Sequence, residues 1–403
     1  MSAVSIFLII ATMVGGLALF MFGMNIMSKA LSSLTGGALD NLLGIVTKNR
    51  FTAFLFGTCL TAIVQSSSTV SVLTVGLVNS GIIQLHQAVG LLIGGGLGST
   101  ATAWLLSLNA LDGESLIMTI VKPSSFSPFL AIVGVAITMF AKKEKTVNIG
   151  YTLLGFAVMM IGMNLMSQGV APLRELPAMQ AALMSVSNPI VGFLVACGIT
   201  VLIQSSDATV GMVQAIALSV CVTYGMAIPL ICGAQVGTCV TAMISSLGTS
   251  NNGKRTALMN LYYALMKVIP FMILFYAADS IWHFSFLEGA VGGIGIPFCH
   301  SLINLFGAAI WIPFGGLIIF LANKTIPFSE EEKQAQENVL TMLDDNLLRN
   351  SSIALDQTDR AVGKLAATVG ETMQLLLQYD SDNEKKTRIL LERVRQYRDQ
   401  IDS

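Results

Sequence analysis

The chain has 403 residues, of which 54% are hydrophobic and only 11% are charged. Soluble proteins carry about 25% charged residues, so this composition excludes a protein that is soluble throughout and indicates a polytopic membrane protein. The formal net charge of -1 conceals a partition, because more than half of the charged residues lie between Glu330 and Asp402. We therefore predict an all-α membrane domain over residues 1–325 and a helical tail over residues 329–403.

The first apolar stretch, residues 4–28, is predicted to be a retained helix. It lacks the basic start of a cleavable signal peptide and is long enough to span a bilayer, which takes about 20 apolar residues. Hydropathy predicts further uninterrupted spans at residues 117–141, 148–168, 256–280 and 297–321.

Two longer apolar regions, residues 51–108 and 190–247, carry polar and glycine-rich interruptions. The run 51–79 has Gln-Ser-Ser-Ser at its centre and would measure roughly 43 Å as one helix, longer than the hydrocarbon core. It is either one broken helix or a re-entrant hairpin of two half-helices. The run 82–108 contains Gly94-Gly-Gly-Leu-Gly98, and we expect it to break in the same manner because glycine is a poor helix former. The residues leave open which run forms the hairpin.

The chain is duplicated around these interruptions. Thr-Ala-Ile-Val-Gln-Ser-Ser-Ser at residues 61–68 returns as Thr-Val-Leu-Ile-Gln-Ser-Ser-Asp at residues 200–207. The same offset relates Met-Phe-Gly-Met-Asn-Ile-Met-Ser, which begins at Met21, to Met-Ile-Gly-Met-Asn-Leu-Met-Ser, which begins at Met160. Twin interrupted segments at corresponding places are typical of a transporter site built from discontinuous helices. The predicted repeats cover about residues 15–141 and about residues 148–280.

Basic residues predict that the two repeats have opposite orientations. Lys29, Lys48 and Arg50 flank the loop after the first helix, whereas the equivalent positions of the second repeat are uncharged. Because cytoplasmic loops collect Lys and Arg, the two loops are expected on opposite sides, which defines an inverted-topology repeat. Basic loops at 142–147 and 248–255 then place the N-terminus outside and the tail in the cytoplasm. Each interrupted region must supply one crossing helix and one re-entrant hairpin.

The interrupted segments can bind ions of either sign. Half-helix N-termini suit an oxyanion, whereas half-helix C-termini and hydroxyl oxygens suit a small cation such as sodium. The chain has no Gly-Lys-Ser/Thr phosphate loop, no zinc-ligand spacing and no nucleophile and base placed by a motif, so we predict neither an enzyme nor a cofactor.

Tandem Gln-Ser-Ser motifs, each followed by a Gly-x-x-x-Gly-[Ser/Thr] segment, resemble the type II sodium/phosphate cotransporter family and its bacterial relatives. The resemblance covers residues 15–325 and includes the His-x-x-x-Asn pattern at His300. It implies a symporter of the inner (plasma) membrane that imports inorganic phosphate, with sodium as the coupling ion and the only metal ion bound. The implied phosphate ligands are Gln65, Ser66, Ser67, Ser68, Gln204, Ser205 and Ser206. The implied sodium ligands are Asp207, Thr209, Gln235, Thr238, Ser99 and Thr100, with His300 and Asn304 in support.

Three residues depart from the family pattern. Asp207 replaces the last serine of the second motif, Gln235 stands where the family often has Asn, and Gly96 leaves the first copy without that amide. A buried carboxylate is costly unless it is protonated or paired with a cation. We therefore predict that Asp207 marks a sodium site. The alternatives are a proton-coupled carboxylate and a helix cap bonded to backbone.

Other polar residues receive structural interpretations. Lys122 and Lys267 are interpreted as side chains that snorkel from near a span end, and His300 as a packing hydrogen-bond donor that has a functional alternative. The six cysteines fall in apolar spans and are interpreted as small core residues.

The tail resembles part of a PhoU-type phosphate regulator and is expected to pack against the membrane domain, a second copy of the chain or a regulatory partner. Two rivals to the symporter remain. One is a proton-coupled or passive anion transporter on the same scaffold, and the other is a phosphate sensor that acts through the tail.

Overall fold

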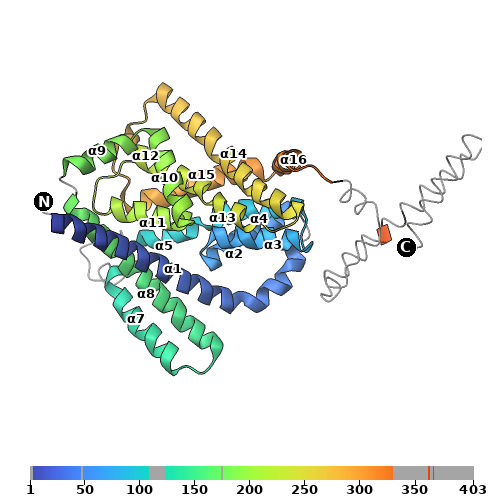
Figure 1. Cartoon of the computed structure of the whole chain (residues 1–403), viewed down its shortest axis with the longest axis horizontal. Coiled ribbons are helices and arrows are strands. Elements are labelled where there is room, and N and C mark those ends of the chain that lie inside the picture. The colour runs from blue at the N-terminus through green and yellow to red at the C-terminus, as the bar shows by residue number, and fades with distance from the viewer. Residues whose placement is uncertain are drawn as a thin grey trace, which may run out of the picture. The chain divides into compact units, whose positions relative to one another are not determined.

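The computed structural model describes residues 3–46, 49–108, 123–173 and 176–329, together with 362, 363 and 366. Its named elements are helices, and an isolated β-bridge joins Thr223 to Ala290 (Figure 1). The chain divides into two units, Met1–Thr325 and Ile326–Ser403. The predicted tail helices, and the resemblance to a phosphate regulator, lie almost wholly outside the described residues.

The α-helices of the first unit have the following bounds in chain order: α1 (Ala3–Val46), α2 (Arg50–Val64), α3 (Ser67–Asn79), α4 (Leu85–Gly98), α5 (Thr100–Ser107), α7 (Pro123–Phe140), α8 (Glu144–Val170), α9 (Pro177–Val186), α10 (Pro189–Ile203), α11 (Ser206–Ala217), α12 (Tyr224–Gly237), α13 (Cys239–Ser245), α14 (Asn251–Trp282), α15 (Gly292–Trp311) and α16 (Gly315–Thr325). Short 3-10 turns lie at η2 (Ala171–Leu173) and η3 (Ser285–Glu288).

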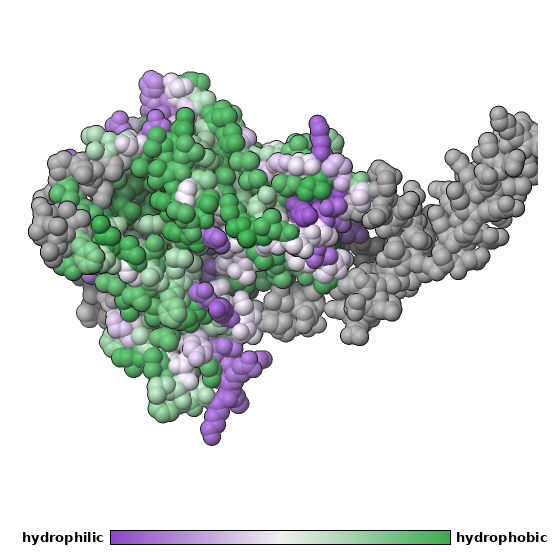
Figure 2. All heavy atoms as spheres, in the orientation of Figure 1, coloured by the Kyte–Doolittle hydropathy of each residue, from purple (hydrophilic) through white to green (hydrophobic). Residues whose placement is uncertain are grey.

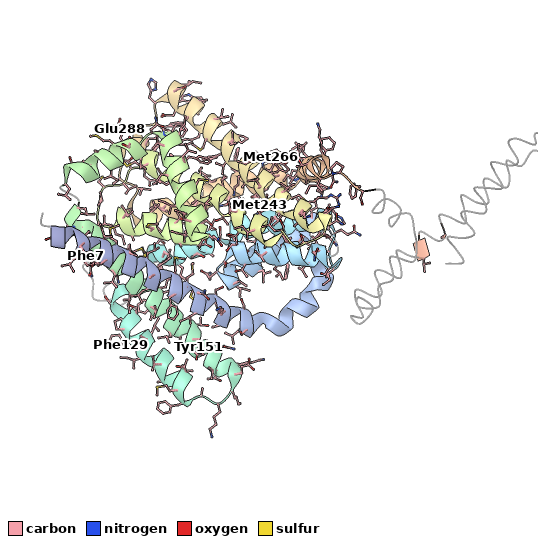
Figure 3. The ribbon with its side chains drawn as sticks, viewed as in Figure 1. Phe7, Phe129, Tyr151, Met243, Met266 and Glu288 are labelled. Carbon is pink, nitrogen blue, oxygen red and sulfur yellow. The ribbon has the colours of Figure 1, made fainter. Side chains whose placement is uncertain are left out.

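The surface of the first unit is that of a membrane protein. Six helical stretches of the described residues are long and apolar enough to cross a bilayer: Phe7–Leu34, Leu85–Ser107, Glu144–Leu173, Tyr224–Ser245, Asn251–Trp282 and Gly292–Trp311. Hydrophobic residues dominate the face that Figure 2 shows. Phe7 on α1 and Phe129 on α7 point away from the bundle, toward the space that lipid would fill (Figure 3). The predicted all-α polytopic membrane protein is confirmed.

Helices α1 and α8 pack against each other in opposite directions. A Cβ atom on Gly16 would overlap the backbone of Met166, and one on Gly23 would overlap the backbone of Met159. Glycines therefore set the close approach of this pair, as small residues do between membrane helices. The N-terminal part of α1 lies beside the C-terminal end of α8.

Helices α2 and α3 form the re-entrant hairpin of the first half. A Cβ atom on Gly90 would overlap the carbonyl oxygen of Arg50, and one on Gly98 would overlap that of Thr58, so α2 and α4 run in the same direction. Because α3 connects the end of α2 to the start of α4, it returns to the face from which α2 entered. The hairpin is therefore the run 51–79, and α4 with α5 forms the crossing.

The predicted break at residues 94–98 is wrong. Helix α4 continues through these glycines, and Ser99 between α4 and α5 keeps right-handed helical angles (φ -64°, ψ -21°). The glycines serve close packing instead, since a Cβ atom on Gly94 would overlap the carbonyl oxygen of Phe54.

The second half has the same arrangement. Gly233 lies against the backbone of Phe193 and Gly237 against that of Cys197, so α10 and α12 are parallel and α11 returns between them. Helix α2 follows the C-terminal end of α1, and α10 follows that of α8 through α9. Because α1 and α8 are antiparallel, the two hairpins enter from opposite ends of this pair.

The predicted last span, residues 297–321, is divided in the structure. Helix α15 ends at Trp311, three turn residues that include Pro313 follow, and α16 starts at Gly315. Proline lacks a backbone N–H and removes one helical hydrogen bond, which favours an interruption at this position. A Cβ atom on Gly315 would lie 3.6 Å from the guanidinium of Arg50. The start of α16 is therefore near the start of α2.

Candidate functional site

The tips of both hairpins are glutamines in left-handed backbone geometry. Gln65 has φ 56° and Gln204 has φ 60°, values that few non-glycine residues adopt. Each glutamine caps the preceding half-helix, because its N–H donates to the carbonyl of Thr61 or of Thr200, four residues earlier. The side-chain amide of Gln65 folds back and donates to the carbonyl of Ala62. The chain thus reverses at the two positions where the motifs recur.

The serine after each glutamine caps the returning half-helix. The Ser66 hydroxyl accepts from the N–H of Thr69 at 3.3 Å, and the Ser205 hydroxyl accepts from the N–H of Ala208 at 3.2 Å. Serine is a preferred N-cap residue for this reason. Two predicted phosphate ligands therefore use one hydroxyl lone pair each to begin α3 and α11.

Two cavities flank the tips. The vestibule, of about 640 Å³, lies between α1 and the tips and is lined by Met21, Met24, Asn25, Ser28, Lys29, Ser32, Ser33, Gln65, Ser66, Ser68, Thr69 and Ser205. The inner pocket is narrow, about 40 Å³, and its polar lining residues are Ser67, Ser71, Ser99, Ser206, Gln235, Thr238, Asn260, Tyr263 and Lys267. Ser67 and Ser206 are the first residues of α3 and α11, so the half-helix N-termini of both halves converge on the inner pocket. Gln204 lines neither cavity.

Asp207 joins the two halves directly. This carboxylate on α11 accepts a hydrogen bond from the backbone N–H of Ser67, at the start of α3. The side chain is buried, and its Oδ1 atom has no hydrogen-bond partner. Asp207 is thus bonded to backbone, as the cap alternative requires, but it caps the half-helix of the other repeat and keeps one oxygen unpaired.

Further buried oxygens near the tips lack partners. Thr61 Oγ1, Gln65 Oε1 and Thr238 Oγ1 are buried and unpaired. An unpaired buried polar atom in a native protein calls for an explanation, such as a bound ion or water. Thr61 and Gln65 lie one turn apart at the C-terminal end of α2, where the helix dipole favours a cation.

Three predicted sodium ligands already form hydrogen bonds with other residues of the protein. The Ser99 hydroxyl donates to the Gly96 carbonyl and the Thr100 hydroxyl to the Leu97 carbonyl, both at 2.8 Å. The Thr209 hydroxyl accepts from the Thr200 hydroxyl at 2.8 Å. Ser99 lines the inner pocket, whereas Thr100 and Thr209 do not.

The interpretation of Lys267 as a snorkelling side chain is wrong. Lys267 is only 2% exposed, and its ammonium donates to Gln235 Oε1 and, at 2.8 Å, to Asn304 Oδ1. It also lies 4.9 Å from the centre of the Tyr263 ring. Its position in the sequence indicates burial, because Lys267 lies in the middle of the predicted span 256–280, too far from either end for a lysine to reach water. Lys122 lies outside the described residues.

The two predicted supporting residues, His300 and Asn304, are both buried on α15. The Asn304 amide donates to the His300 carbonyl at 2.9 Å while its oxygen holds the Lys267 ammonium. Both ring nitrogens of His300 are buried without a partner, which does not fit a packing hydrogen-bond donor.

The vestibule is also lined by residues of α1, which lie outside the Gln-Ser-Ser motifs. Asn25, Ser28 and Lys29 share one helix face and line the cavity beside the first tip. The signal was present, because Asn25 and Ser28 belong to the repeated Met-Asn-Ile-Met-Ser segment.

The fold and the site define a polytopic membrane protein whose two re-entrant hairpins meet at one buried polar site. The family model described as Na+/Pi-cotransporter matches residues 19–168 and again residues 169–299. The chain belongs to this family, which makes it a membrane transport protein and not an enzyme. The suspected family is therefore confirmed.

Named relatives are distant. The chain is 22% identical over 311 residues to YqeW of Bacillus subtilis (strain 168), an uncharacterised protein, covering 76% of this chain and 95% of that one. It is 22% identical over 306 residues to YjbB of Escherichia coli (strain K12), provisionally named an inorganic phosphate export protein, covering 75% of this chain and 53% of that one. YjbB of Salmonella typhimurium is 21% identical over 371 residues, 91% of this chain and 64% of the relative. No solved structure matches the chain significantly.

Proposed function

We propose that the chain transports inorganic phosphate across the cell membrane, with phosphate bound between the two hairpin tips. The observation that carries this proposal is the convergence of the α3 and α11 N-termini, one from each half, on the inner pocket. Helix N-termini attract oxyanions through free N–H groups and the helix dipole. The buried ammonium of Lys267 adds positive charge in the same pocket.

Sodium is the proposed coupling ion. Its ligands would include the unpaired Asp207 oxygen, as the sequence predicts, and the unpaired oxygens of Thr61 and Gln65 support a cation position near the first tip. Hydroxyl, amide and carboxylate oxygens are ligands that hard cations prefer. A sodium ion beside Asp207 would also separate this carboxylate from the phosphate.

Alternating access would follow from inverted repeats. The two hairpins enter from opposite ends of the α1/α8 pair, which supports the inverted topology. With the basic residues inside, the vestibule beside Lys29 is the cytoplasmic approach to the tips. Transport then requires the site at the tips to open alternately toward the vestibule and toward the opposite surface.

The direction of transport is open to two proposals. Symport with sodium entering down its gradient gives phosphate import, the direction that the resemblance implies. Export is the second candidate, because the named relatives in Escherichia coli and Salmonella typhimurium are provisionally assigned to phosphate export.

Proteoliposomes test the function and its direction. Radiolabelled phosphate uptake would be measured with a sodium gradient directed inward, with the same gradient reversed, and with potassium in place of sodium. We expect saturable uptake that the inward sodium gradient drives. Uptake that a pH gradient drives, or that is equal with potassium, would contradict sodium coupling in favour of the proton-coupled or passive transporter. Absence of phosphate flux under every condition would contradict transport and favour the alternative that the chain is a phosphate sensor.

A further inference from the structure

The ammonium of Lys267 occupies a position built from the ligands that a sodium ion would use. Its two hydrogen-bond acceptors are amide oxygens, Gln235 Oε1 and Asn304 Oδ1, and the Tyr263 ring adds a cation–π contact. Its hydrogen-bond and ring contacts among the described residues are all with uncharged side chains. Gln235 is one of the sodium ligands that the family resemblance implies.

The surrounding helices are shaped to admit the lysine. A Cβ atom on Gly307 of α15 would overlap the Cγ and Cδ atoms of Lys267, so only glycine leaves room for the stem. A Cβ atom on Gly96 of α4 would lie 3.1 Å from Asn304 Oδ1. The amide missing from position 96 is therefore explained: Asn304 and Tyr263 fill that space and hold the ammonium.

The charge lies beside the proposed phosphate position. Lys267 lines the inner pocket together with Ser67 and Ser206, the first residues of the two returning half-helices. A buried cation is costly when it has only neutral partners. An oxyanion at these N-termini would supply the missing negative charge.

We propose that the Lys267 ammonium replaces one coupling sodium ion, as a stationary cation that holds the Gln235 position and compensates phosphate charge. This inference rests on the proposed function, since it concerns how many sodium ions accompany phosphate. A stationary cation stays behind when the substrate leaves. The cargo therefore carries one positive charge fewer per phosphate, and an inside-negative membrane potential favours its outward movement more than it would with that sodium aboard.

The number of sodium ions bound per chain, measured without phosphate, tests whether Lys267 replaces one of them. Equilibrium binding of radioactive sodium would be measured on the purified full chain in lipid nanodiscs, for the native protein and for Lys267→Ala. Removing the stem leaves the amide oxygens and a space, so the variant is expected to bind about one sodium ion more per chain. Lys267→Met removes the charge but fills the space and is expected to gain none. The control is Lys324→Ala, because Lys324 is exposed at the end of α16.

Phosphate binding supplies the second readout. At low sodium, Lys267→Ala is expected to bind phosphate at least tenfold more weakly than the native chain, with recovery as sodium is raised. Unchanged phosphate binding, a loss that sodium does not restore, or no gain in bound sodium would each overturn the proposal. If Lys267→Ala does not fold, Gly307→Ala displaces the stem and should weaken phosphate binding in the same sodium-dependent way. A native chain that binds no phosphate would refute the proposed function, whereas the sodium count would still decide the role of Lys267.

Discussion

Asp207 is the residue at which the two hairpin tips differ in charge, since Ser68 occupies the equivalent position of the first repeat. Its carboxylate accepts from the N–H of Ser67 across the repeats and keeps Oδ1 free. One carboxylate oxygen thus ties the tips together, and Oδ1 has no hydrogen-bond partner and is available to a cation. The role in capping α3 and the role in binding sodium can therefore be separated by experiment.

If Oδ1 binds sodium, Asp207→Asn should keep the shape but lose the charge. Sodium affinity is then expected to fall about tenfold, or about 1.4 kcal/mol, and phosphate affinity to fall less. Asp207→Ser should be tolerated better than Asp207→Ala, because a hydroxyl remains an oxygen ligand. The measurement is the sodium dependence of phosphate uptake in proteoliposomes. Identical sodium dependence in the native, Asn and Ala forms would show that the residue only caps α3.

Gln65 carries separate backbone and side-chain roles. Its left-handed geometry costs a non-glycine residue roughly 1–2 kcal/mol, so Gln65→Gly should raise thermal stability or leave it unchanged. The same change removes the amide whose Oε1 is unpaired, and phosphate uptake should be abolished. A folded Gln65→Gly protein with native uptake would show that the tip needs only its backbone shape. The melting temperature in detergent and the uptake rate give the two readouts.

At the scale of elements, glycines have two distinct uses in this chain. Gly90, Gly94 and Gly98 of α4 lie against α2 and set the distance between the helices, whereas Gly76 of α3 has open space where its Cβ would be. Sequence alone does not separate the two, because both kinds lie in apolar runs. The break expected at residues 94–98 was wrong for this reason.

The matched pair Gly94→Ala and Gly76→Ala exposes this difference. Alanine at Gly76 meets nothing and removes backbone entropy from the unfolded chain, so it should stabilise by about 0.5–1 kcal/mol. Alanine at Gly94 overlaps the Phe54 carbonyl and forces α2 and α4 apart, which we expect to cost about 1–3 kcal/mol. Thermal unfolding in detergent measures both. A melting temperature that rises in both variants would contradict the tight α2/α4 packing.

The motif residues were predictable from sequence because their pattern is local and repeated. Polar residues in an apolar run, followed by a second copy, locate the tips of both hairpins without coordinates. Lys267 and Gly307 were harder, since their contact joins α14 to α15 and neither residue belongs to a repeated motif. Long-range contacts between unique residues leave no periodicity to detect, so the lysine was assigned to the membrane surface.

For the whole molecule, the proposed alternating access depends on the two repeats having opposite orientations. Single cysteines at Ser33 and Ser187, in a variant without the six native cysteines, test it. Ser33 is exposed and lines the vestibule, and Ser187 is exposed between α9 and α10. Because Lys29, Lys48 and Arg50 surround the end of α1 and their equivalents in the second repeat are uncharged, Ser33→Cys should react with an impermeant thiol reagent from the cytoplasmic side and Ser187→Cys from outside. Oriented vesicles of both polarities provide the measurement, with phosphate uptake confirming that each variant is folded. Reaction of both cysteines from the same side would establish parallel repeats, and the two hairpins would then have to open toward one compartment.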